Sequence, residues 1–157
     1  MYITPHVLVG ASVGLATGNP IFGFIGGVAS HYVLDAIPHA DSGTLHYGQL
    51  TGKSLDIRDY ILSTIDVAAA VLSIIWLSYK VPFVDSASIW GALGGAAPDS
   101  LVLLKLFLPK AAEQSILKAY YYYTDKIEYT VKPQYWWLGV VTQVITIGAA
   151  LWYLLAR

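Results

Sequence analysis

Residues 23–35 read GFIGGVASHYVLD, and this stretch decides the fold class that the sequence predicts. Glycines stand at 23, 26 and 27, the residues between them are apolar, and the ionisable residues His31 and Asp35 follow. Glycines at this spacing let helices approach backbone to backbone in lipid. The stretch therefore predicts a closely packed membrane helix with polar groups at one end.

The same pattern returns in residues 91–99, which read GALGGAAPD. Its glycines have the spacing of the first stretch, and Asp99 stands at the offset of His31. Two helical-hairpin repeats are predicted from this match, 5–17 with 20–37 and 60–79 with 86–108. Glycine-rich faces can pack within one chain or between chains, so a homo-oligomer is left open.

The composition points to lipid as the solvent of this chain. Apolar residues make up 56 % of the 157 residues, charged residues 12 %, and the mean hydropathy is +0.57. A soluble domain of this size needs more charge on its surface. A net charge of −1 gives no reason to expect a nucleic-acid partner, and the lack of cysteine excludes disulfides and thiolate ligands.

Five apolar segments are long enough to consider as membrane helices, since a crossing needs about 20 residues. We predict one all-α integral membrane domain, 1–157, with segments at 5–17, 20–37, 60–79, 86–108 and 135–156. The first segment is short enough to re-enter instead of crossing. Region 109–133 contains four successive tyrosines among charges, which favours an interfacial helix over the alternative of a soluble loop.

The basic residues predict which end faces the cytoplasm. If all five segments cross, one side holds most of them, namely Lys53, Arg58, Lys105, Lys110, Lys118, Lys126 and Lys132. The opposite side holds Lys80 and Arg157. Because cytoplasmic loops are enriched in Lys and Arg, the N-terminus is predicted to be cytoplasmic.

Ionisable side chains inside hydrocarbon are costly and are candidates for function. The first four segments contain five acidic or histidine side chains, all predicted within the cytoplasmic half by the helical rise: His6, His31, Asp35, Asp66 and Asp99. We therefore expect one polar pocket that opens to the cytoplasmic side.

The densest group lies between Ser30 and Asp41. His31 and Asp35 are four residues apart and share a helix face, and Pro38 ends the helix so that His39 and Asp41 can fold back over its end. Imidazoles with carboxylates suit a divalent cation, with Zn²⁺ as first choice and Mn²⁺, Fe²⁺ or Mg²⁺ as alternatives. The competing interpretation is a His–Asp hydrogen bond that only closes the helix end.

Three blocks resemble a known family: Thr4-Pro5-His6 with Gly10, Ser30-His31 with Asp35, and Ala97-Pro98-Asp99. They are similar to the small bacterial and archaeal membrane-bound metal-dependent hydrolases of the LexA-regulated type. The stretch from His31 to Ala40 also resembles the metal-binding helix of the zinc-dependent phospholipase C and single-strand nuclease superfamily. The resemblance implies phosphoester hydrolysis by bound metal in a cytoplasmic membrane.

These observations predict a membrane-embedded metal-dependent hydrolase of a lipid or other amphiphilic phosphoester. The expected metal ligands are His6, His31, Asp35, His39, Asp66 and Asp99. Asp99 and Asp41 are the expected catalytic residues, Asp41 as a general base or as a group that orients a ligand. A transporter of divalent cations or protons, and a membrane scaffold with a structural metal, remain the alternatives.

Overall fold

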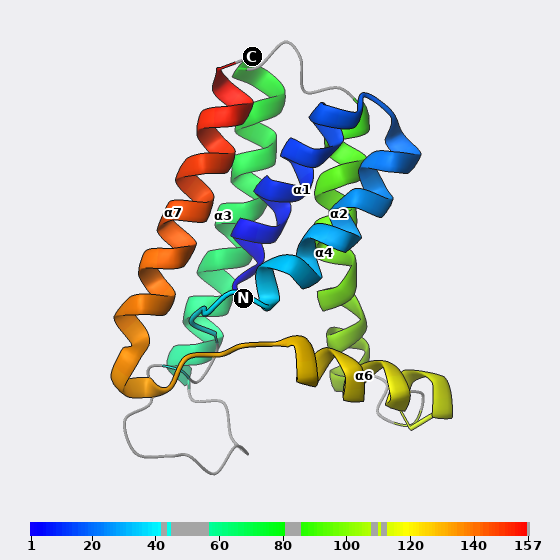
Figure 1. Ribbon diagram of the computed structural model, residues 1–157, viewed down its shortest axis with the longest axis vertical. Helices are drawn as coiled ribbons and strands as arrows, with labels where there is room; N and C mark the ends of the chain where they lie inside the picture. The colour runs from blue at the N-terminus through cyan, green and yellow to red at the C-terminus, as the bar shows by residue number, and fades with distance from the viewer. Residues whose placement is uncertain (42–43, 45–56, 81–85, 108–109, 111–112, 157) are drawn as a thin grey trace.

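The computed structural model describes residues 1–41, 44, 57–80, 86–107, 110 and 113–156. These residues form six α-helices, a short 3-10 turn at Pro133–Tyr135 and no strand beyond one isolated bridge (Figure 1). The α-helices are α1 (Ile3–Thr17), α2 (Pro20–Asp35), α3 (Ile57–Lys80), α4 (Ser86–Phe107), α6 (Ser115–Ile127) and α7 (Trp136–Leu155). The all-α prediction is confirmed.

Helices α1, α2, α3, α4 and α7 run in alternating directions along one bundle (Figure 1). The start of α1, the end of α2 and the start of α7 lie at the same end of this bundle. Helix α6 lies across that end of the bundle (Figure 1). Lys53, Arg157, 108–109 and 111–112, which the predictions used, lie outside the described residues.

The turn between α1 and α2 follows from its sequence. Gly18 adopts φ 60°, the left-handed conformation that glycine tolerates best, and ends α1. The Asn19 side chain then accepts hydrogen bonds from the N–H groups of Ile21 (2.9 Å) and Phe22 (3.2 Å). With Pro20 in the first turn of α2, the predicted tight hairpin is confirmed.

Glycines bring α1, α2 and α4 into backbone contact. A Cβ atom at Gly10 or at Gly27 would collide with the carbonyl oxygen of Gly91, and one at Gly94 would collide with that of Phe24. The glycine faces thus pack within the chain, as their spacing allowed. Helix α4 packs on α1 and α2, whereas α3 and α7 each pack on α1. Helices α3 and α4 are therefore not packed against each other in the described part of the chain, and the predicted hairpin pairing of 60–79 with 86–108 is wrong.

The second half of the core joins α1 to α3 and α7. Its buried side chains include Leu8 and Ala11 of α1, Ala70 of α3 and Leu154 of α7. Helix α1 therefore lies at the centre of the bundle, with α2 and α4 on one side and α3 and α7 on the other. This central position places the first turn of α1 next to the ends of its neighbours.

Many large apolar side chains on the outside of the bundle are exposed. Examples are Phe22 on α2, Leu72 on α3, and Ile145 and Trp152 on α7. Among the described residues, one span, Pro133–Leu155, is both long and apolar enough to cross a membrane, and Ile3–Thr17 and Tyr60–Trp76 are shorter apolar helical stretches.

Two helix boundaries differ from the prediction for reasons that the structure gives. Helix α1 begins at Ile3 because the carboxylate of Asp66, on α3, accepts hydrogen bonds from the N–H groups of Ile3 and Thr4. Helix α2 ends at Asp35 rather than at Ile37, because Pro38 disfavours a helical conformation at the residue before it.

Candidate metal centre

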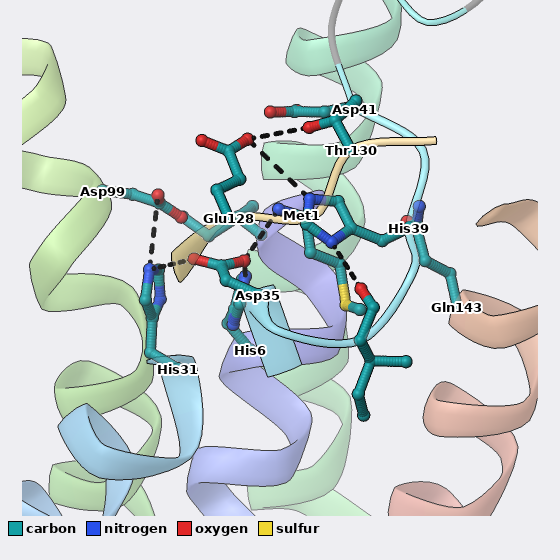
Figure 2. Close-up of polar contacts among 12 residues, drawn as sticks. Met1, His6, His31, Asp35, His39, Asp41, Asp99, Glu128, Thr130 and Gln143 are labelled. Carbon is teal, nitrogen blue, oxygen red and sulfur yellow. Dashed lines mark hydrogen bonds and ion pairs between the residues drawn. The ribbon is translucent and has the colours of Figure 1, made fainter. Parts of the chain in front are cut away.

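Two buried histidines meet where the start of α1 approaches the end of α2 (Figure 2). The His6 and His31 rings are stacked, with 3.9 Å between their centroids, and their exposed fractions are 0 % and 3 %. Neither ring nitrogen of His6 meets the geometry of a hydrogen bond, although Nε2 lies beside the Asp35 carboxylate. Because burial of a polar nitrogen without a hydrogen bond is unfavourable, a cation or a proton at Nε2 would stabilise this arrangement.

Asp35 joins the two rings. Its Oδ1 atom lies 3.1 Å from His6 Nε2, and its Oδ2 atom lies 3.0 Å from His31 Nε2. The amino group of Met1 also lies 2.9 Å from Asp35 Oδ1. The predicted placement of His31 and Asp35 on one helix face is therefore realised, and His6 adds a second imidazole from another helix.

A backbone contact fixes the orientation of His31. Its Nδ1–H donates to the carbonyl oxygen of Gly95 (2.8 Å). This contact leaves Nε2 directed at the carboxylates. Helix α4 comes this close because Gly95 has no side chain, and a Cβ there would collide with the carbonyl oxygen of His6. The glycine pattern thus positions the imidazole as well as the helices.

Asp99 brings a second carboxylate from α4. Its Oδ1 atom lies 3.8 Å from His31 Nε2, and ligand atoms of His6, His31 and Asp99 all lie within 4.8 Å of one another. The Asp99 side chain is 33 % exposed, so it lies at the edge of this group. We call His6, His31, Asp35 and Asp99 the His31 cluster.

His39 lies apart from the His31 cluster, although the sequence predicted one site for both. The structure groups it with Asp41 and Glu128, whose ligand atoms also lie within 4.8 Å of one another. We call these three residues the His39 cluster. Backbone bonds place it beside the end of α2, because the N–H of Tyr129 donates to the carbonyl oxygen of Asp35 (2.8 Å).

Glu128 was not found from the sequence. It follows α6, far along the chain from His39 and Asp41, and no spacing rule connects it to them. A glutamate side chain is a carboxylate at neutral pH and can act as a cation ligand.

Asp66 belongs to neither cluster of described residues. Its two carboxylate oxygens accept the hydrogen bonds at the start of α1, and its carbonyl oxygen accepts one from the Thr4 hydroxyl (3.0 Å). In this position the carboxylate caps an N-terminus, where negative charge is favourable. Asp66 thus holds the helix that presents His6.

The donor atoms of the His31 cluster fit a borderline divalent cation. The group that could hold an ion has two imidazole nitrogens and the Asp99 carboxylate, with the Asp35 carboxylate beside both imidazoles. Zn²⁺, Mn²⁺ and Fe²⁺ accept these ligand types, and both imidazoles are buried. A histidine that binds a metal through one ring nitrogen usually donates the N–H of the other to a carbonyl or carboxylate. The Nδ1–H of His31 makes such a bond to the carbonyl oxygen of Gly95. Buried His and carboxylate groups that could hold a metal ion are therefore present, as predicted.

Comparison with known proteins gives no relative from which a role can be transferred. No protein-family model, no curated protein and no solved structure matches this chain.

Proposed function

We propose that this protein is an integral membrane, metal-dependent hydrolase of an amphiphilic phosphoester, with a divalent cation bound by the His31 cluster. One observation supports it most strongly. Two buried imidazoles from different helices turn their Nε2 atoms to the same carboxylate, Asp35, and Asp99 lies beside them. The alternative named from the sequence, a His–Asp hydrogen bond that only closes the end of the helix, would need one histidine and not two.

The exposed side chains support a membrane location. A soluble monomer rarely exposes large contiguous apolar patches, yet apolar side chains cover the outer faces of α2, α3 and α7. In this proposal lipid covers them, and the five bundle helices cross with the cluster at the cytoplasmic end. The basic residues Lys110, Lys118, Lys126 and Lys132, on or beside α6, agree with that orientation.

Helix α6 supports an amphiphilic substrate. Tyr121 is buried, and its hydroxyl donates to the carbonyl oxygen of Leu101 (2.7 Å). Tyr122 and Tyr123 are exposed on the same helix. Tyrosines are favoured at the level of lipid headgroups. In this proposal α6 lies at the headgroup level of the cytoplasmic leaflet, so the cluster is close to lipid headgroups.

The residues of the cluster have distinct roles in this proposal. A bound divalent cation would lower the pKa of a water molecule and offset charge on phosphoryl oxygens. His6, His31 and Asp35 would hold the cation, and the burial of both histidines keeps their geometry fixed. Asp99, the most exposed of the four, is the carboxylate nearest the entering substrate.

Asp99→Asn tests the hydrolase directly. Asn keeps the volume of Asp and one acceptor oxygen but loses the charge that holds a cation. The purified full-length chain in detergent is supplied with short-chain phospholipids or polyprenyl phosphates and with Zn²⁺, Mn²⁺ or Mg²⁺. We expect metal-dependent product release by the parent and a loss on the order of 10²-fold in Asp99→Asn.

Asp125→Asn is the matched control, because Asp125 is an exposed carboxylate on α6 outside both clusters. It should retain the parent rate. No product from any lipid phosphoester, together with metal-dependent ion flux into sealed vesicles, would reject the hydrolase and favour a transporter. Full metal content without either activity would favour a scaffold with a structural metal.

A further inference from the structure

The His39 ring is held in an unusual state. Its side chain is fully buried, and its Nδ1 atom lies 2.9 Å from the carbonyl oxygen of Ile37, to which it donates as the Nδ1–H tautomer. The Nε2 atom is also buried and makes no hydrogen bond. This buried ring nitrogen is thus left without a hydrogen-bond partner, which is unfavourable unless another group binds it.

The chain fixes this ring with contacts from two distant segments. The N–H of His39 donates to the carbonyl oxygen of Tyr129 (3.2 Å), and the N–H of Val131 donates to that of His39 (2.9 Å). On the other side, the Gln143 side chain of α7 donates to the carbonyl oxygen of Ala40 (2.7 Å). A Cβ at Gly139 would collide with the backbone nitrogen of Ala40. The ring therefore has little freedom to turn away from its neighbours.

Two carboxylates lie beside the unpaired nitrogen (Figure 2). Glu128 Oε1 is 3.8 Å from His39 Nε2, and ligand atoms of Asp41, Glu128 and His39 lie within 4.8 Å of one another. The Thr130 hydroxyl donates to Glu128 Oε1 (3.1 Å) and orients that carboxylate. The oriented carboxylate and the oriented imidazole come from segments that only the tertiary fold brings together.

We propose that His39, Asp41 and Glu128 bind a second divalent cation, of the Zn²⁺ or Mn²⁺ class. Two N/O donors that each lie about 2.1 Å from one tetrahedral ion stand roughly 3.4 Å apart. The 3.8 Å between His39 Nε2 and Glu128 Oε1 is close to that separation and too long for a direct hydrogen bond. One imidazole and two carboxylates leave a coordination position for water or for a phosphoryl oxygen.

The distances argue against a simple His–Glu ion pair. A protonated imidazole that donated to a carboxylate would lie about 2.7–2.9 Å from it. The Nδ1–H bond to Ile37 and the Thr130 bond to Glu128 hold both groups in place without that contact. This arrangement is typical of metal ligands, whose remaining polar atoms bond to the surrounding protein.

This inference is independent of the hydrolysis proposed above, because it concerns binding alone. The test is the zinc content of the metal-stripped full chain in detergent after incubation with Zn²⁺ and removal of free ion. We expect Glu128→Gln and His39→Gln each to bind one zinc fewer per chain than the parent. Asp125→Asn should bind as many as the parent. Gln at 128 still accepts the Thr130 bond, so folding should persist, which circular dichroism checks.

His31→Ala separates the two sites. It should also lose one zinc, and His31→Ala combined with Glu128→Gln should lose two. If Glu128→Gln and His39→Gln keep the parent zinc content, the His39 cluster is an ion pair only and the second site is rejected, whatever His31→Ala does. If Glu128→Gln loses a zinc and His31→Ala loses none, the second site stands and the first fails.

Thr130→Val provides a graded readout for the same site. It removes the hydroxyl that orients Glu128 and keeps the shape of the side chain. By titration with Zn²⁺ we expect the affinity of this site alone to fall roughly 10- to 100-fold, as for other groups that orient metal ligands. An unchanged affinity would show that Glu128 is not a ligand.

Discussion

The His31 and His39 clusters use the same ligand chemistry on two different supports. In each, a buried imidazole donates Nδ1–H to a backbone carbonyl, that of Gly95 or that of Ile37, and directs Nε2 at carboxylates. The His31 cluster is built from three packed helices. The His39 cluster is built from two connecting segments, which an isolated β-bridge joins at His39 and Thr130.

This difference in support determines which contacts each cluster depends on. Helix approach through glycine positions His6, His31 and Asp99, so the His31 cluster should fail when α4 is pushed away. The segment that holds His39 is clamped by α7 and by residues 129–131, so the His39 cluster should fail when this clamp opens. Each site can therefore be disrupted without changing a ligand.

Gly95→Ala should have the largest effect. The added Cβ would collide with the carbonyl oxygen of His6, which is backbone and cannot move aside cheaply. We expect a loss of about 3 kcal/mol in the free energy of unfolding, together with loss of zinc from the His31 cluster. Reversible unfolding in mixed micelles measures the stability, and zinc content measures the site.

Gly148→Ala is its control, since a Cβ at Gly148 of α7 meets no atom within 4 Å. There the substitution should be neutral or stabilise the helix by about 0.5–1 kcal/mol. Equal destabilisation by Gly95→Ala and Gly148→Ala would contradict the role of helix approach.

Gly139→Ala should affect the His39 cluster alone. Its Cβ would push against the backbone of His39 and Ala40 at the edge of the bundle, away from the contact of α1 with α4. We expect a loss of about 1–2 kcal/mol, since this turn can shift more easily than a packed helix. The variant should lose zinc from the His39 cluster and keep it in the His31 cluster. Loss of zinc from the His31 cluster alone would contradict the expectation that Gly139 supports the His39 cluster.

Asp66→Asn should have the smallest effect. It weakens the cap on Ile3 and Thr4 at the start of α1, which should cost about 1 kcal/mol. Since Asp66 belongs to neither cluster, the zinc content should equal that of the parent. A missing zinc in this variant would restore Asp66 to the ligand set that the sequence predicted.

Much of the fold followed from local sequence. Apolar runs located the bundle helices, and the Gly18-Asn19-Pro20 break located the first turn. The helices that pack against α4 could not be predicted. Glycine spacing indicates that a helix packs closely against another helix, but it does not identify that helix. The N-terminal end of α1 was also missed, since its cap comes from α3 and has no local signal.

The candidate site was also predictable only in part from the sequence. His31 and Asp35 share a helix face by spacing alone, and the depths of His6 and Asp99 suggested that they meet. The separation of His39 from His31 could not be predicted, because it depends on a bridge to Thr130. Glu128 could not be found either, since the same bridge brings it to His39 from a distant segment.

X-ray absorption at the zinc edge tests the central claim, that His6 and His31 together bind a divalent cation. The sample is the full chain with Glu128→Gln, loaded with one equivalent of Zn²⁺, so that the metal is confined to the His31 cluster. We predict nitrogen and oxygen ligands at about 2.0–2.1 Å with outer-shell scattering from two imidazoles. An all-oxygen shell without imidazole scattering, or a spectrum unchanged by the further substitution His31→Ala, would contradict the account.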